Sequence, residues 1–170
     1  DDEITTGDYA DTIVAGDGDN TVVAGDGDNN VTTGRGDDTI TVGDGDNTIT
    51  AGIGDDTVTA GGTTTSTTVF DTNTVDLGNG DDTYTGGAGR DIVTLGAGDD
   101  TVDTGAGTDS IYMSDFDDDD VINGGAGTDT LSVDALVAST VAAPLQVQAE
   151  ARFIDVTPGT SGTSSPQFTA

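Results

Sequence analysis

Between Ala15 and Ala60 apolar and polar positions alternate with a fixed period. An aliphatic side chain stands at every ninth position, at Val22, Val31, Ile40, Ile49 and Val58. The flanking residues are often threonine, as in Thr39-Ile40-Thr41. Because successive side chains of a strand point to opposite faces, this alternation predicts one short strand per nine residues, with the aliphatic residue inside and the threonines outside.

Pairs of glycines separate these predicted strands. The first glycine of each pair stands at 16, 25, 34, 43 or 52, and the second follows two places later. Glycine suits tight turns because it adopts positive φ and allows close backbone approach. A fixed period of this kind predicts a stacked repeat. We therefore expect an all-β fold, a right-handed parallel β-roll with two short strands per 18-residue coil. Val, Ile and Leu would form a thin interior, with Ala15, Ala24 and Ala51 at its corners.

The register extends over most of the chain. It begins at Gly7, where Tyr9 replaces the second glycine, and resumes over 78–113 and 125–133. We interpret 61–77 as two degenerate half-turns of one continuous stack, with a linker between two stacks as the alternative, and 114–124 as one irregular half-turn. Fourteen half-turns would form seven coils, a body on the order of 35 Å long. The β-roll would thus span 1–133, followed by a capping or assembly segment at 134–156 and a linker or tail at 157–170.

Charge and composition exclude several functions. The chain has 33 acidic and 3 basic residues, a formal charge of −30, which would repel nucleic acid and anionic lipid. It has no His and no Cys, so imidazole and thiolate chemistry are absent, and no other catalytic set is visible; we expect no enzyme activity. No apolar run is long enough for a membrane-spanning helix. Such acidity is also typical of disordered tails, but the acids recur at fixed offsets from the glycines, which favours a metal-dependent fold.

Stacking would bring carboxylates of successive coils together. Residues 18 apart share an edge of the coil, so Asp38 would lie one layer from Asp56, Asp82 from Asp100, and Asp91 from Asp109. Two carboxylates about 4.8 Å apart repel by about 1 kcal/mol in water and by several times more at a partly buried edge. A divalent cation between the layers would reverse this effect. Carboxylates with backbone carbonyls suit Ca²⁺, with its six to eight flexible oxygen ligands, better than Mg²⁺.

This register resembles the nonapeptide of the repeats-in-toxin (RTX) family, G-G-x-G-x-D-x-U-x, in which U is a large apolar residue. The resemblance covers about residues 7–133 and implies a β-roll that binds several calcium ions through the Asp at the sixth position and the turn carbonyls. Carried over, the aspartates are Asp11, Asp38, Asp56, Asp82, Asp91, Asp100, Asp109 and Asp129. Asn20, Asn29 and Asn47 replace this Asp in three turns; an Asn oxygen can still bind calcium, and Asp19, Asp28 and Asp46 are adjacent. The glycines of the predicted metal-binding turns are Gly16, Gly18, Gly25, Gly27, Gly34, Gly36, Gly43, Gly45, Gly52, Gly54, Gly78, Gly80, Gly87, Gly89, Gly96, Gly98, Gly105, Gly107, Gly125 and Gly127.

Calcium binding would then control folding. With a dissociation constant of about 0.1–1 mM, millimolar calcium adds roughly 0.4–1.4 kcal/mol per site. About ten sites contribute on the order of 4–14 kcal/mol, comparable to the whole stability of a domain. At micromolar calcium the contribution is close to zero, so we expect a chain that is unfolded inside a cell and folded outside it.

Three functions remain open at this stage. The first is a secreted, calcium-folded structural module of a bacterial surface-layer, filament or adhesin protein; the resemblance implies type I export, an extracellular or cell-surface location, and self-association or other cell-surface partners. The second is the calcium-binding tail of an exported enzyme or toxin. The third is ice binding by outward Thr-x-Thr pairs at 39–41 and 57–59, which the sequence indicates over two coils only.

Overall fold

The protein is built from strands throughout its described part. The computed structural model describes residues 1–61, 71–113 and 119–133, and the segments expected at 134–156 and 157–170 lie outside this range. No helix occurs among these residues, and accordingly none that could cross a membrane.

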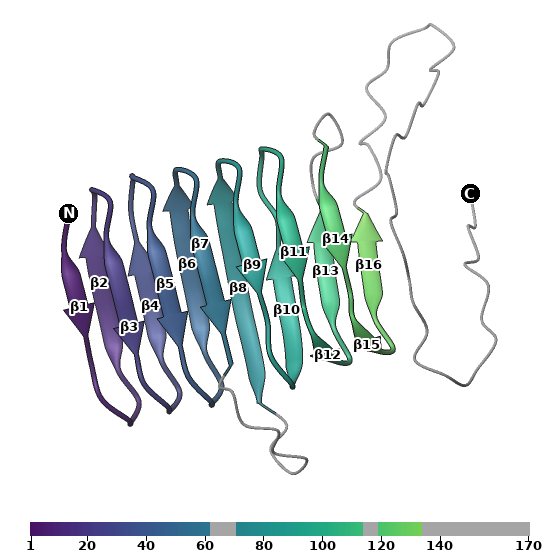
Figure 1. Ribbon diagram of the computed structural model, residues 1–170, viewed down its shortest axis with the longest axis horizontal. Helices are drawn as coiled ribbons and strands as arrows, with labels where there is room; N and C mark the ends of the chain where they lie inside the picture. The colour runs from purple at the N-terminus through teal and green to yellow at the C-terminus, as the bar shows by residue number, and fades with distance from the viewer. Residues whose placement is uncertain (62–70, 114–118, 134–170) are drawn as a thin grey trace, which may run out of the picture.

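Two seven-stranded sheets lie face to face along the length of the molecule (Figure 1). The first sheet contains β1 (Glu3–Thr5), β3 (Thr21–Ala24), β5 (Thr39–Val42), β7 (Thr57–Ala60), β9 (Thr83–Thr85), β11 (Thr101–Asp103) and β14 (Val121–Asn123). The second sheet contains β2 (Thr12–Gly16), β4 (Asn30–Thr33), β6 (Thr48–Ile53), β8 (Thr72–Asn79), β10 (Arg90–Thr94), β13 (Ser110–Met113) and β16 (Thr130–Val133). The chain alternates between the sheets, so each pair of strands completes one turn.

All strand pairs are parallel, and most are offset by one 18-residue turn. In the first sheet Ile40 pairs with Val22 on one side and with Val58 on the other. In the second sheet Val31 pairs with Ile13 and Ile49 in the same way. The predicted all-β solenoid of stacked parallel strands, two per turn of about 18 residues, is confirmed.

The prediction of two half-turns over 61–77 is wrong. Strand β8 belongs to the second sheet, between β7 and β9 of the first, so the described residues here complete one half-turn and not two. Thr48 pairs with Thr74 and Thr57 with Thr83, an offset of 26 residues in both sheets. The chain here is eight residues longer than one turn requires, and both sheets remain continuous across it. Near the C-terminal end, β14 is offset from β11 by 20 residues.

The structure contains three strands that the sequence pattern did not predict. Strand β1 precedes the first glycine and pairs with β3. Strands β12 (Ala106–Gly107) and β15 (Ala126–Gly127) form a third, two-stranded sheet within the turns. Tyr9, in the place of a second glycine, adopts the glycine-like φ of 142°.

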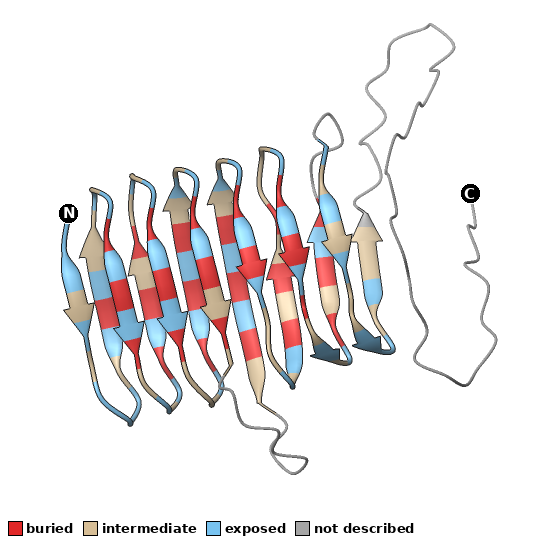
Figure 2. Cartoon of the chain, in the orientation of Figure 1, coloured by how far each residue is buried: buried red, intermediate tan, exposed pale blue. Residues whose placement is uncertain are grey.

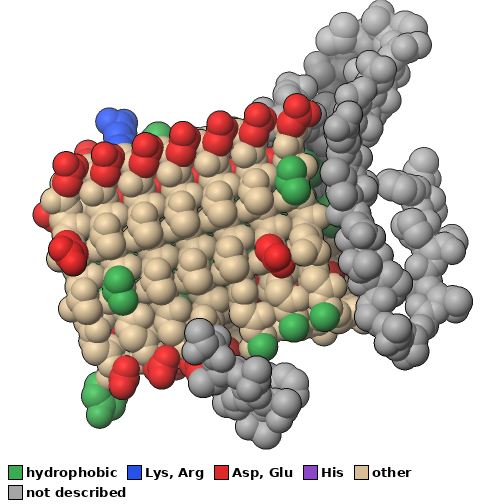
Figure 3. Space-filling model, viewed as in Figure 1, with side chains coloured by type: hydrophobic (Ala, Val, Ile, Leu, Met, Phe, Trp, Pro, Cys, Tyr) green, Lys and Arg blue, Asp and Glu red, His purple; other side chains and the backbone are tan. Residues whose placement is uncertain are grey.

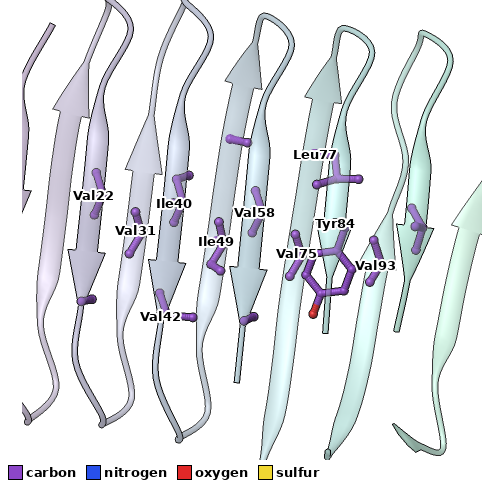
Figure 4. Packing of buried hydrophobic residues seen from close by; sticks show 14 of the residues in the cluster. Val22, Val31, Ile40, Val42, Ile49, Val58, Val75, Leu77, Tyr84 and Val93 are labelled. Carbon is purple, nitrogen blue, oxygen red and sulfur yellow. The ribbon is translucent and has the colours of Figure 1, made fainter. Parts of the chain in front are cut away.

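Buried positions recur along the strands of both sheets (Figure 2), and their apolar side chains form a narrow core between the sheets. Each strand of the two seven-stranded sheets contributes one or two of them, and the threonines on either side are mostly exposed, as the alternation predicted. Figure 4 shows Val22, Ile40, Val58 and Tyr84 along the first sheet and Val31, Ile49, Val75 and Val93 along the second. Ala24 and Ala51 belong to this core and are fully enclosed. One small set of side chains per layer thus fills the interior, and it leaves the edges of the roll to polar residues.

Candidate metal-binding edges

Each edge of the roll carries a column of stacked Asp and Asn side chains, which we call the inner ladders. Their members stand at or next to the start of each strand. The ladder of the first sheet contains Asp2, Asn20, Asp38, Asp56, Asp82, Asp100 and Asp120. The ladder of the second sheet contains Asp11, Asn29, Asn47, Asn73, Asp91, Asp109 and Asp129.

Backbone N–H groups connect most members of each ladder, and in the second ladder the side-chain amides of Asn47 and Asn73 donate to Asn73 and Asp91 instead. The N–H of Asp38 donates to Oδ1 of Asp56 at 2.7 Å, and the N–H of Asp56 donates to Oδ1 of Asp82 at 2.7 Å. Asp82 in turn donates to Oδ1 of Asp100 at 3.0 Å. Each carboxylate therefore reaches back to the preceding layer with one of its two oxygens.

The second oxygen of several ladder aspartates has no hydrogen-bond partner among the described residues. Oδ2 of Asp38, Asp56 and Asp82 is buried in this way, and each of these residues is only 1% exposed. Such an atom has lost its water and gained nothing in exchange, a cost of about 1–3 kcal/mol or more for a charged group. Three such atoms in successive layers of one edge indicate that a positive partner belongs there.

Burial perturbs the ionisation of Asp56 and Asp82. It raises the pKa of Asp82 to about 7, which the N–H of Asp56 opposes and the charges of Asp100 and Asp56 reinforce. The pKa of Asp56 rises to about 6, mainly through burial and in part through the charges of Asp38, Asp37 and Asp55. At these edges the charged form is therefore disfavoured unless a cation compensates it.

The pKa values on the opposite edge move in the same direction. Burial raises the pKa of Asp91 to about 6, opposed by the hydrogen bond from Asn73 and reinforced by the charge of Asp109. The pKa of Asp109 is also raised, again first by burial. Both ladders are thus short of positive charge.

A second row of aspartates lies outside the first ladder. The N–H of Asp37 donates to Oδ1 of Asp19, that of Asp55 to Asp37, and that of Asp81 to Asp55, each at 3.0 Å. These carboxylates are exposed and reach forward one layer, in the opposite sense to the inner ladder. Figure 3 shows a row of acidic side chains, one per layer, along one edge of the roll. The outer row adds negative charge to the same edge.

Close stacking of the turns brings main-chain oxygens to this edge. Gly54 has a φ of 135°, and a Cβ placed on it would meet the carbonyl oxygen of Gly36 in the layer below. Only glycine allows two turns to approach so closely. The turns therefore present carbonyl oxygens next to the buried carboxylates.

The carboxylate and carbonyl oxygens of this edge are suitable ligands for Ca²⁺. The edge offers hard oxygens from carboxylates and carbonyls and an uncompensated negative charge, the ligand set that Ca²⁺ prefers. Within residues 1–61, 71–113 and 119–133 no three acidic side chains gather closely enough to hold a metal by themselves. Main-chain carbonyls would therefore have to supply much of the coordination, as expected from the glycine-rich turns.

The structure brings together the aspartates that the 18-residue spacing paired. The predicted stacking of Asp91 on Asp109 is confirmed by a 2.8 Å hydrogen bond, as is that of Asp38 on Asp56 and of Asp82 on Asp100. Asp11 joins its ladder through Asn29, and Asp129 joins it through Asp109.

The sequence prediction left Asp2 and Asp120 out of the ladders, and it placed Asn73 in a degenerate half-turn without counting it among the metal ligands. Asp2 precedes the first glycine, Asn73 follows an irregular segment, and Asp120 ends the run Asp117–Asp120, in which no spacing selects one residue. A weak signal was present in the position of each, because an aliphatic residue follows two places later, at Ile4, Val75 and Ile122. The 18-residue spacing also left Asp56 without a predicted partner in the next layer, because the offset to Asp82 is 26 residues.

Comparison with protein families gives one match. The family model described as the RTX calcium-binding nonapeptide repeat (4 copies) matches residues 1–31, 32–63, 76–111 and 116–135, most of the chain. Comparisons with curated proteins and with solved structures gave no match.

Proposed function

Because this chain belongs to the RTX calcium-binding repeat family, we propose that it is a secreted structural module that folds on meeting calcium outside the cell. The ions would lie at the two edges of the roll, held by the inner-ladder aspartates and by carbonyls of the glycine turns. The ligand carboxylates would be Asp11, Asp38, Asp56, Asp82, Asp91, Asp100, Asp109 and Asp129. The observation that carries this proposal is the column of buried, unpartnered oxygens on Asp38, Asp56 and Asp82.

The test is far-UV circular dichroism of the whole chain in chelator, in millimolar Ca²⁺ and in millimolar Mg²⁺. We expect β signal in calcium, little in chelator, and little in magnesium, which demands a tighter octahedral site. An equal β signal in chelator and in calcium would refute the proposal.

A role in a bacterial surface layer, filament or adhesin follows from the same properties. The described roll has a small core and a strongly acidic edge. Its sheets end in β1 and β2, whose outer edges can pair with a further strand. We propose that copies associate through such ends, and sedimentation velocity with and without calcium tests this: a monomer at all concentrations in calcium would rule it out.

Ice binding is a second candidate, favoured by the threonine rows. The expectation that these rows end after two coils is wrong. Thr39, Thr57 and Thr83 are in register along the first sheet, and so are Thr41, Thr59 and Thr85. The third pair escaped notice because the 26-residue offset hides its register. An ice-recrystallisation assay on the calcium-loaded chain decides this candidate, and growth of ice crystals at the rate of buffer alone would exclude it.

A further inference from the structure

Three turns close themselves with a side-chain amide. In the first, Nδ2 of Asn20 donates to the carbonyl oxygens of Gly16 at 3.0 Å and Gly18 at 2.6 Å. Asn29 bonds to the first and second glycines of its own turn at 2.9 Å each, and Asn47 to those of its turn at 3.1 and 3.0 Å. The same two carbonyls of the turn are therefore occupied in all three cases.

Asn and Asp occupy equivalent positions in the ladder. Oδ1 of Asn20 accepts the N–H of Asp2 at 2.9 Å, as Oδ1 of Asp38 accepts the N–H of Asn20 at 2.7 Å. With this atom fixed, the second terminal atom of each planar group points to the same side. In Asn20 it is an NH₂ group with two partners, whereas in Asp38 it is a buried oxygen with none.

We propose that the amides of Asn20, Asn29 and Asn47 take the place of calcium in their turns, so that calcium is required by the Asp turns alone. This inference rests on the proposed calcium-dependent function. An amide supplies two hydrogen-bond donors to the two carbonyls and removes the negative charge. A cation bound to those carbonyls would have to displace it. These Asn residues are thus built-in substitutes for the ion rather than ligands.

The placement of the three Asn turns makes the requirement unequal along the roll. All three precede β7, and from Asp82 onward every predicted ligand of both ladders is Asp. The N-terminal coils accordingly carry fewer buried ladder carboxylates. They should hold their structure at lower calcium than the C-terminal coils.

The test counts bound ions per chain at saturation, by equilibrium dialysis with elemental analysis. Asn20→Asp extends the row of Asp38 and should add about one ion; the reciprocal Asp56→Asn should remove about one and keep the β signal. Matched controls are Asn30→Asp and Asp76→Asn, which make the same charge changes at exposed strand positions and should leave the count unchanged.

The outcomes separate this inference from the function on which it rests. A wild-type chain that binds no calcium would end both. A wild-type chain that binds calcium, with an unchanged count and higher affinity in Asn20→Asp, would show that Asn20 is itself a ligand and overturn the inference alone. Should Asn20→Asp not fold, Asp56→Asn decides: a lost ion with retained β signal supports substitution by the amide, and an unchanged count refutes it. Hydrogen exchange at sub-saturating calcium adds a second readout, with protection expected first in β2 to β6; protection that appears first in β9 to β13 would overturn the inference.

Discussion

At the scale of single residues, a few atoms per layer determine whether the polar groups at the edges of the roll have partners. Asp38 and Asn20 differ by an oxygen for an NH₂ group, and this difference determines whether a turn is satisfied or lacks a partner. Glycine is equally decisive where two turns meet. Gly54 combines positive φ with close contact to the carbonyl oxygen of Gly36, so no other residue fits without strain.

Gly54→Ala should therefore destabilise the calcium-loaded roll by about 1–3 kcal/mol or more, from the strained backbone and the displaced turn. Gly7→Ala is the matched control, because a Cβ there meets nothing within 4 Å and its φ lies outside the positive range. Urea denaturation in millimolar calcium measures both. Equal midpoints for the two variants would contradict this account of the turn.

At the scale of elements, the inward aliphatic residues of each strand determine the position and register of each layer. Ile49 is 1% exposed and lies opposite Val31 in β4 and Val75 in β8. Because the core is one side chain deep, neighbouring layers have few atoms with which to fill a cavity. Truncation of such a residue should therefore leave an open cavity and lower the free energy of unfolding by nearly the full amount expected for the lost side chain.

Ile49→Ala should cost about 2–5 kcal/mol, because it removes buried methylene groups and leaves a void. Calcium and folding are linked, so the variant should need a higher calcium concentration to reach half its β signal. Thr48→Ala on the exposed face is the control and should shift the midpoint little. An unshifted midpoint for Ile49→Ala would mean that the aliphatic row does not hold the layers together.

The elements also show what sequence could and could not predict. Alternation of apolar and polar residues around Ile40 and Ile49 was enough to place strands and their inward faces, because successive side chains of a strand point to opposite faces. It was not enough for β1, which has no flanking glycine pair, or for the half-turn before β8, where length was mistaken for an additional strand. The hydrogen bonds of Asn20, Asn29 and Asn47 were likewise out of reach, because an Asn oxygen and an Asp oxygen are equivalent ligands until the turn geometry is known.

At the scale of the whole molecule, stability depends on how the charge of both edges is compensated. Ladder aspartates on both edges, among them Asp56, Asp82 and Asp91, have raised pKa values, and the chain carries 33 acidic residues against 3 basic ones. Calcium is one way to neutralise these groups. Protons are another, because a protonated carboxyl group no longer repels its neighbour in the next layer.

Acid should therefore partly replace calcium. Asp56 and Asp91, with pKa values of about 6, and Asp82, with a pKa of about 7, bind protons more tightly when folded than at the ordinary value of 3.8. The folded, calcium-free chain thus takes up more protons than the unfolded chain between about pH 7 and 4. Its stability must rise as the pH falls through that window and level off below it.

Circular dichroism in chelator from pH 7.5 to 4.5 tests this prediction, with β signal expected to appear on acidification. Asp82→Asn should show a smaller gain, because one of the proton-binding groups is missing. A chain that loses β signal steadily on acidification in chelator would contradict the prediction.

The long connection between β7 and β8 shows that the corners of the roll accept additional sequence. Eight residues beyond one turn enter between Ala60 and Thr72, and Ile49 still lies opposite Val75, as Val58 does opposite Tyr84. Insertions and deletions at corners thus leave the packing of the strands unchanged. Insertion or deletion of a single residue inside a strand would instead turn the following side chains to the wrong face. Proteins of this kind can therefore vary the length of their corners while the stacked strands stay the same. A peptide inserted at a corner would be displayed there without redesign of the core.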